Sequence, residues 1–133
     1  MILTELFFGS LAEVTDRATG APYPAGDWRE NYLDKDGTIS IYESEHRFPG
    51  QKRIYFIPDG PSALYLSTSF GELQTTEGEY ILETGNSIYR FRIDQERTEA
   101  AVREVMRARS VREANGQDKE NRDQDGNKEG DKQ

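Results

Sequence analysis

The chain of 133 residues contains no cysteine and only one histidine. Without thiols it cannot form disulfides, cysteine-ligated zinc sites or iron–sulfur sites, and it cannot use thiol catalysis. The single histidine, His46, cannot build a His-based metal cluster, and its polar surroundings in ESEHRFPG predict a solvated side chain. Neither a G-x-G-x-x-G nor a G-x-x-x-x-G-K-S/T phosphate-binding pattern occurs. The sequence therefore predicts no cofactor, no metal and no enzymatic activity.

Long apolar runs are also lacking. No stretch of about 18 apolar residues is present, and the opening MILTELFFGS has an acidic residue but no basic one. We therefore expect no membrane span, no signal peptide, no membrane partner and a cytoplasmic location. The formal charge is −8, of which residues 1–93 carry −6. Such a chain is repelled at long range by phosphate backbones, which disfavours nucleic acid as its partner.

Short β-strand signals dominate the chain after residue 37. Segments rich in β-branched and aromatic residues alternate with turn residues, at 38–44, 52–57, 62–69, 79–83 and 87–93. This spacing predicts a mainly β (α+β) fold, either a small antiparallel meander or a five-stranded barrel. In the last segment the alternation places Tyr89 and Phe91 in the core and Arg90 and Arg92 on the outer face.

The N-terminal part is less clearly patterned. Residues 1–14 combine high β propensity with apolar residues at helical spacing, so strand and helix both remain open. Residues 15–36 lose the apolar periodicity and contain several glycines and prolines, which predicts a long loop anchored by Tyr23, Trp28 and Tyr32. A loop of this length is either functional or conceals a further element.

One helix is predicted at about residues 94–114, with Asp94 as its N-cap and arginines near its end. Asn115-Gly116 is expected to end this helix. Its apolar side chains form a narrow stripe that could cover a sheet or meet a partner helix, made of Ala101, Val102, Val105 and Met106. Residues 117–133 contain no apolar side chain, so we expect a single domain at 1–115 and a disordered polar tail at 116–133.

Residues 32–43 resemble the calcium-binding loop of an EF-hand. Asp34, Asp36 and Glu43 occupy the third, fifth and twelfth loop positions, as that loop requires. The first position, however, holds a tyrosine instead of an acidic ligand, and a strand pattern follows where the second helix should begin. We therefore interpret Asp36-Gly37 as an ordinary turn and expect no calcium binding.

Basic and aromatic side chains form the one group of residues that could make a binding patch on the surface. If the strands at 52–57 and 87–93 lie close together, they create a positive patch with stacking platforms, as in single-strand-binding β-barrels. Its members would be Arg47, Lys52, Arg53, Tyr89, Arg90 and Arg92. The alternative is that the rings are core and the cations solubilise the outer face, which the charge of −6 favours.

Two functions are consistent with these features. The first is a small acidic protein-interaction module whose partner is another protein, an accessory or inhibitory factor of the phage or mobile-element type with no catalysis of its own. The second is a nucleic-acid-binding small β-barrel that uses the Arg/Tyr patch. The net charge favours the first, and the sequence leaves the oligomeric state open.

Overall fold

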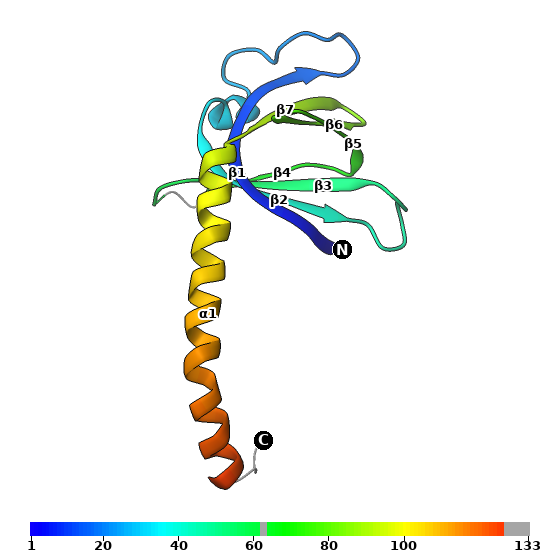
Figure 1. The fold of residues 1–133 in the computed structure, drawn as a ribbon. Helices are drawn as coiled ribbons and strands as arrows, with labels where there is room; N and C mark the ends of the chain where they lie inside the picture. Colours follow the sequence, from blue (N-terminus) through cyan, green and yellow to red (C-terminus); the bar gives the residue numbers. More distant parts are fainter. Residues whose placement is uncertain (62–63, 127–133) are drawn as a thin grey trace. The chain divides into compact units, whose positions relative to one another are not determined.

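The computed structural model describes residues 1–61 and 64–126, with side chains up to residue 114. The chain divides into two compact units, Met1–Thr98 and Glu99–Gln133. The elements are β1 (Ile2–Asp16), the 3-10 helix η1 (Trp28–Tyr32), β2 (Asp36–Glu43), β3 (Lys52–Pro58), β4 (Leu66–Ser67), β5 (Gly71–Thr76), β6 (Glu79–Thr84), β7 (Ser87–Ile93) and α1 (Gln95–Gly126) (Figure 1). The prediction of a mainly β fold with one C-terminal helix is confirmed.

The described strands form one antiparallel sheet that closes partly into a ring. Their order is β2-β1-β7-β6-β5-β3-β4, and a further pairing between β2 and β3 closes the ring. Six of the strands are therefore linked in a circuit, with β4 attached to β3. The weakest link lies between β3 and β5, where the only paired residues are Lys52 and Gly71.

The long strand β1 pairs with a different neighbour along each part of its length. Its first part pairs with β2 and its second part with β7, and the pairing register shifts between Leu3 and Glu5 and again between Leu11 and Glu13. Such bulges bend a strand and interrupt its two-residue alternation. The interruption explains why the apolar residues of 1–14 imitate helical spacing although the segment is a strand.

Two glycines permit neighbouring strands to approach closely, Gly9 between β1 and β7 and Gly37 between β2 and β3. A Cβ atom on Gly9 would collide with the carbonyl oxygen of Arg92, and one on Gly37 would collide with that of Ile57. Gly37 and the preceding Asp36 lie within β2. The interpretation of Asp36-Gly37 as a turn is therefore wrong, because the glycine serves strand contact and not a reversal of the chain.

The segment between β1 and β2 contains η1, which the sequence did not predict. Tyr32 is buried, and its hydroxyl donates to the Tyr65 carbonyl at 2.9 Å. Tyr23 donates to the Asn86 carbonyl at 3.2 Å. These two residues anchor the segment as predicted, whereas Trp28 remains 48% exposed.

The sequence pattern does not predict β5, and it predicts a longer strand than β4 at 62–69. The strand β5, GELQTT, has a single apolar residue, Leu73, and thus lacks the alternation that marks a half-buried strand. The strand expected at 62–69 is described only as the two residues Leu66–Ser67.

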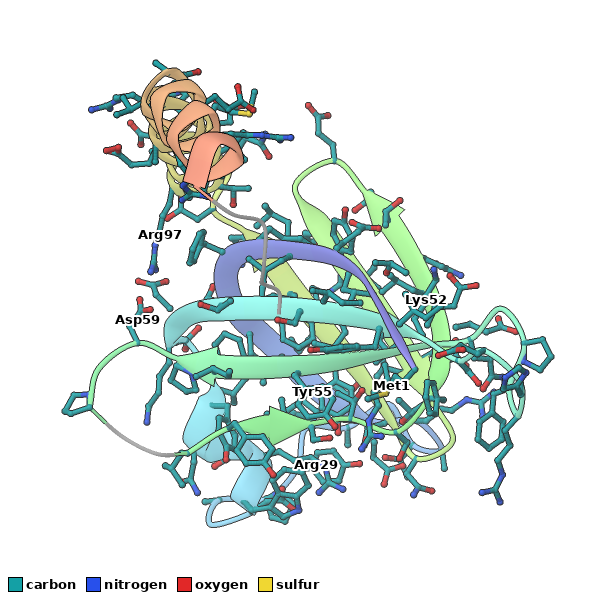
Figure 2. The ribbon with its side chains drawn as sticks, turned by 90° about the horizontal axis from the view of Figure 1, so that it is seen from below. Met1, Arg29, Lys52, Tyr55, Asp59 and Arg97 are labelled. Carbon is teal, nitrogen blue, oxygen red and sulfur yellow. The ribbon has the colours of Figure 1, made fainter. Side chains whose placement is uncertain are left out.

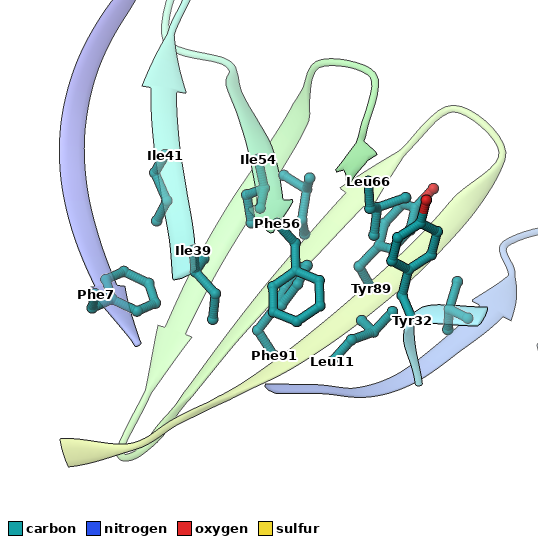
Figure 3. Packing of buried hydrophobic residues seen from close by; sticks show 12 residues of the cluster. Phe7, Leu11, Tyr32, Ile39, Ile41, Ile54, Phe56, Leu66, Tyr89 and Phe91 are labelled. Atoms are coloured by element: carbon teal, nitrogen blue, oxygen red, sulfur yellow. The ribbon is translucent and has the colours of Figure 1, made fainter. Parts of the chain in front are cut away.

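A core of alternating inward residues fills the ring (Figure 3). Its buried members are Phe7, Leu11, Val14, Tyr32, Ile39, Ile41, Ile54, Phe56, Leu66, Leu82, Tyr89 and Phe91. The rings of Phe56 on β3 and Phe91 on β7 lie 5.9 Å apart across the interior. The predicted alternation of β7 is confirmed, because Tyr89 and Phe91 are buried while Arg90 and Arg92 face outward.

The helix α1 runs past its expected end at Asn115-Gly116 and continues to Gly126. A glycine inside a helix costs only about 1 kcal/mol and does not by itself end it. The predicted tail at 116–133 extends beyond the described residues, and its disorder remains a prediction, as does the domain boundary at 115. In the described part of the chain, no helix combines the length and hydropathy needed to cross a lipid bilayer.

Candidate binding surface

The structure does not assemble the basic patch considered from the sequence. The strands β3 and β7 are not neighbours: β3 pairs with β2, β4 and β5, whereas β7 pairs with β1 and β6. They face each other across the core, so their outward side chains point to opposite sides of the ring. Tyr89 is 4% exposed and belongs to the core, so its ring offers no surface for stacking.

Several of the predicted patch residues are engaged with carboxylates. The Lys52 Nζ atom lies 2.9 Å from Glu43 Oε1. The Arg90 guanidinium lies 2.8 Å from Glu79 and 3.3 Å from Glu13. Arg92 is exposed on β7 and has no ion-pair partner among the described residues. The Lys52 and Arg90 pairs join neighbouring strands, and each is worth at most about 1 kcal/mol at an exposed site.

The predicted apolar stripe lies on the part of α1 that belongs to the second unit. Val102, Val105 and Met106 are 57%, 65% and 56% exposed, and Ala101 is partly exposed. Nothing in the described residues identifies what would cover these side chains.

A different cluster emerges on the outer face of the β2–β3 hairpin and of the segment that follows it. We call it the aromatic–arginine surface, and it consists of Tyr42, Arg47, Phe48, Arg53, Tyr55, Tyr65 and Phe70. It arises because Arg53 and Tyr55 alternate with the buried Ile54 and Phe56 along β3, and Tyr55 is visible on this strand in Figure 2. Pairing with β2 places Tyr42 opposite Arg53.

Three tyrosines form one half of this surface. The ring of Tyr55 stacks on that of Tyr65 at 6.2 Å with an interplanar angle of 13°. The ring of Tyr42 meets Tyr55 edge-on at 5.3 Å. Tyr65 is 57% exposed, whereas the other two are half-buried. The rings support one another while presenting their outer edges and faces to solvent.

Arg53 lies at the centre of the aromatic–arginine surface. Its guanidinium carbon is 5.2 Å from the ring centre of Tyr55 and 5.6 Å from that of Phe70. Its Nε atom donates to the Thr68 carbonyl at 2.8 Å, and its Nη2 atom donates to Ser67 Oγ at 2.9 Å. Both acceptors are neutral. Among the described residues no carboxylate lies within ion-pair distance, so the positive charge of Arg53 is uncompensated.

Four other arginines of the barrel unit have a carboxylate partner, whereas Arg47 and Arg92, like Arg53, have none among the described residues. Arg17 pairs with Glu83 at 2.7 Å, and Arg29 pairs with Asp27 at 3.0 Å. Arg97 pairs with Asp59 at 2.7 Å, and these two side chains point toward each other in Figure 2. The Arg97 guanidinium also holds the pKa of Asp59 below its ordinary value. Arg53 is thus fixed over two rings by neutral acceptors and has no carboxylate within ion-pair distance among the described residues.

Phenylalanines extend the surface toward one end of the ring. The rings of Phe48 and Phe70 lie 5.4 Å apart, and the Arg47 guanidinium is 5.4 Å from the ring centre of Phe48. A hollow of about 370 Å³ lies beside both phenylalanines and reaches Arg17. A second hollow of about 310 Å³ contacts Phe70 and Arg47. Phe70 therefore lines both hollows.

The remaining candidates from the sequence are not brought together. Asp36 and Glu43 stand at opposite ends of β2, roughly 20 Å apart for a strand of this length, so they cannot bind one calcium ion as the EF-hand alignment requires. His46 has a side chain that is 92% exposed and lies beside Glu45. In the described residues, no group of three or more His, Asp or Glu side chains is placed to hold a metal ion.

No protein-family model, curated protein or solved structure matches the chain. The candidate site therefore rests on the geometry of its own residues.

Proposed function

We propose that the chain is a protein-binding module that recognises its partner through the aromatic–arginine surface, and that it has no catalysis of its own. One observation carries this proposal: Arg53 is held on Tyr55 and Phe70 by neutral acceptors and has no carboxylate within ion-pair distance among the described residues. Tyrosine and arginine are the residues most enriched at the energetic centres of protein interfaces. The module would act as an accessory or inhibitory factor by occupying a surface of that partner.

The arrangement also defines the chemistry of the partner. The guanidinium keeps free N–H groups for a carboxylate, and the exposed ring of Tyr65 offers apolar contact beside it. We infer a partner that presents an Asp or Glu side chain next to an apolar or aromatic group. Because many contacts among the rings already exist within the chain, little side-chain entropy is lost on binding.

A protein is favoured over nucleic acid as the partner because of charge. The chain carries −8 overall, and carboxylates such as Glu45 and Glu72 lie exposed in the segments that flank the surface. Binding to a phosphate backbone gains most of its affinity from several cations that each contact a phosphate. Only Arg47 and Arg53 are available for this on the aromatic–arginine surface.

The test compares matched variants of the tagged full-length chain in nuclease-treated lysate of the parent organism. We expect a discrete protein to be retained by the wild type and by Arg92→Gln, but lost in Arg53→Gln and in Tyr65→Ala. Arg92 is the matched control because it is an exposed arginine on the opposite side of the ring. The affinity of the isolated partner should fall by about 30-fold or more for each surface variant, as for an interface hot spot.

Circular dichroism of each variant separates lost binding from lost folding. Tyr65 is mostly exposed, so its removal should leave the fold intact. Retention of the same protein by Arg53→Gln and Tyr65→Ala would refute the proposal. Saturable binding of a single-stranded oligonucleotide at physiological salt, abolished by Arg53→Gln, would instead assign the surface to nucleic acid.

A further inference from the structure

The first half of β1 has one unpaired edge. The strand β2 lines one side of this half, but β7 joins the other side only from Gly9. At Phe8 this other side is closed by the start of α1, because Asp94 N donates to the Phe8 carbonyl at 2.8 Å and Phe8 N donates to Thr98 Oγ1 at 3.1 Å. Before Phe8, no described strand lies on that side.

Leu6 carries the free backbone groups of this edge. In a strand every second residue directs its N–H and C=O groups to the same side, and no bulge separates Leu6 from Phe8. The N–H and C=O groups of Leu6 therefore point away from β2, as those of Phe8 do, and no described residue hydrogen-bonds to them. The bulge between Leu3 and Glu5 turns the backbone toward β2 at Ile2, so the free edge is short. Such an edge is a template for a short extended segment, which gains two hydrogen bonds from Leu6.

A hollow of about 330 Å³ lies beside this edge. It is lined in part by Glu5, Leu6 and Phe7 of β1, together with Tyr80 and Ile93. Glu5 and Phe7 share one face of β1 because they are two residues apart. Tyr80 contacts both: its ring lies 4.6 Å from that of Phe7, and its hydroxyl donates to Glu5 Oε1 at 2.8 Å. The hollow therefore combines apolar walls with one carboxylate.

Glu5 defines which segment fits this edge. It is the only charged side chain that lines the hollow within the described chain, and Glu77 and Glu96 adjoin lining residues in the sequence and add negative charge. An inward charge keeps an apolar strand away from a sheet edge, because the charge would be covered without compensation. A strand that brings a cation removes this penalty. Charge complementarity thus selects a basic segment and disfavours a second copy of this chain, which would bring another Glu5.

We propose that the edge binds an extended basic segment of a partner protein, antiparallel to β1 as in all the pairs between described strands. An apolar residue of the segment lies opposite Leu6 and on the same face, where the Leu6 side chain is 53% exposed. The neighbouring residue is a lysine or arginine that points to the face of Glu5. Its alkyl stem lies in the hollow beside Tyr80, and its charged end reaches the Glu5 carboxylate. Because the edge is outside the aromatic–arginine surface, this proposal does not rest on the proposed function.

The experiment titrates the full-length chain with a blocked peptide, Val-Lys-Val-Lys-Val, and follows binding by NMR. We expect saturable binding at millimolar peptide, and the Leu6 amide should then exchange several-fold more slowly. Replacing both lysines of the peptide by glutamate should abolish binding. N-methylation of its valines should also abolish binding, because it removes the N–H that bonds to Leu6, whereas N-methylation of its lysines should not, because their N–H groups face away from β1.

Two matched variants of the chain test the role of the carboxylate. Glu5→Gln keeps an oxygen that accepts from the Tyr80 hydroxyl but removes the charge, so the peptide affinity should fall about tenfold. Glu72→Gln removes the same charge from an exposed glutamate on β5 and should change the affinity less than about twofold.

Several outcomes would overturn the proposal. One is that the lysine peptide does not bind, or that its glutamate or N-methylvaline form binds equally well. Another is that N-methylation of the lysines abolishes binding, which would reject the antiparallel register. An equal loss of affinity in Glu5→Gln and Glu72→Gln would show attraction by net charge alone. Protection of the Leu6 amide that rises with protein concentration in the absence of peptide would assign the edge to a second copy and also reject the proposal.

Discussion

Thr68 gives the most direct test of how the ring is closed beside the aromatic–arginine surface. Its N–H donates to the Ile54 carbonyl at 3.0 Å, and its Oγ1 atom accepts from the Ile54 N–H at 3.0 Å. The same hydroxyl donates to the Ser69 carbonyl at 2.9 Å. Thr68 is 2% exposed and Ile54 is fully buried. A side chain therefore replaces the backbone acceptor that a neighbouring strand would normally supply to β3.

Thr68→Val keeps the shape of the side chain and removes the hydroxyl. The buried Ile54 N–H then has no acceptor, which costs about 1–3 kcal/mol, whereas the Ser69 carbonyl lies in an exposed residue and can bond to water. The added methyl group offsets under about 1 kcal/mol. We expect a net loss of about 1–2 kcal/mol, and for a unit of this size each kcal/mol lowers the thermal midpoint by about 4–8 °C.

Urea unfolding followed by circular dichroism measures this change, and amide exchange at Ile54 reports its location. Thr68→Ser is the control, because it retains the hydroxyl and loses only a methyl group. The Ile54 amide should remain protected in Thr68→Ser and should exchange faster in Thr68→Val. A Thr68→Val protein as stable as the wild type, or one with an unchanged Ile54 exchange rate, would refute the reasoning.

Three further outcomes are expected. Gly37→Ala should lower the free energy of unfolding by about 1–3 kcal/mol in urea titrations through overpacking, whereas Gly85→Ala should have little effect because nothing lies within 4 Å of its added Cβ. Burial and the hydrogen bond to Glu5 raise the pKa of Tyr80 to about 12; absorbance titration should show one late phenol that Tyr80→Phe removes. Since the unfolded pKa is about 10, this phenol stabilises the fold below pH 10 and the contribution is lost as pH rises toward 12. Millimolar calcium should leave the thermal midpoint unchanged, and an increase that Asp36→Asn abolishes would contradict the separation of the carboxylates along β2.

Much of the ring could be predicted because buried and outward-facing residues alternate along several of its strands. The segments at 38–44, 52–57 and 87–93 alternate clearly, and their inward residues form the core. The strand β1 could not be assigned because two bulges break its alternation, and β5 was missed because it contributes only Leu73 as an apolar residue. Local pattern identifies a strand only where one face is regularly buried.

The candidate surface was partly accessible from the sequence. The sequence singles out Arg53 but groups it with Arg90 and Arg92, which the structure places on the far side of the ring. Antiparallel pairing of the adjacent strands 38–44 and 52–57 would have placed Tyr42 opposite Arg53, and this neighbour relation was the available signal. No local pattern marks Tyr65 or Phe70, since their position depends on how the irregular chain after β3 returns to that strand.

The structure also links the proposed binding residue to closure of the fold. On the side away from β2, the strand β3 is held by its short pairing with β4, by one pairing with β5 and by hydrogen bonds to residues 67 and 68. Two of these hydrogen bonds come from the Arg53 side chain. Arg53 thus fastens the segment that carries Phe70. Contacts within the chain therefore organise the aromatic–arginine surface, which would lower the entropy cost of the proposed binding. Arg53→Lys should therefore weaken partner binding more than it weakens the fold, because lysine keeps the charge but cannot bond to residues 67 and 68 in a plane stacked on the rings.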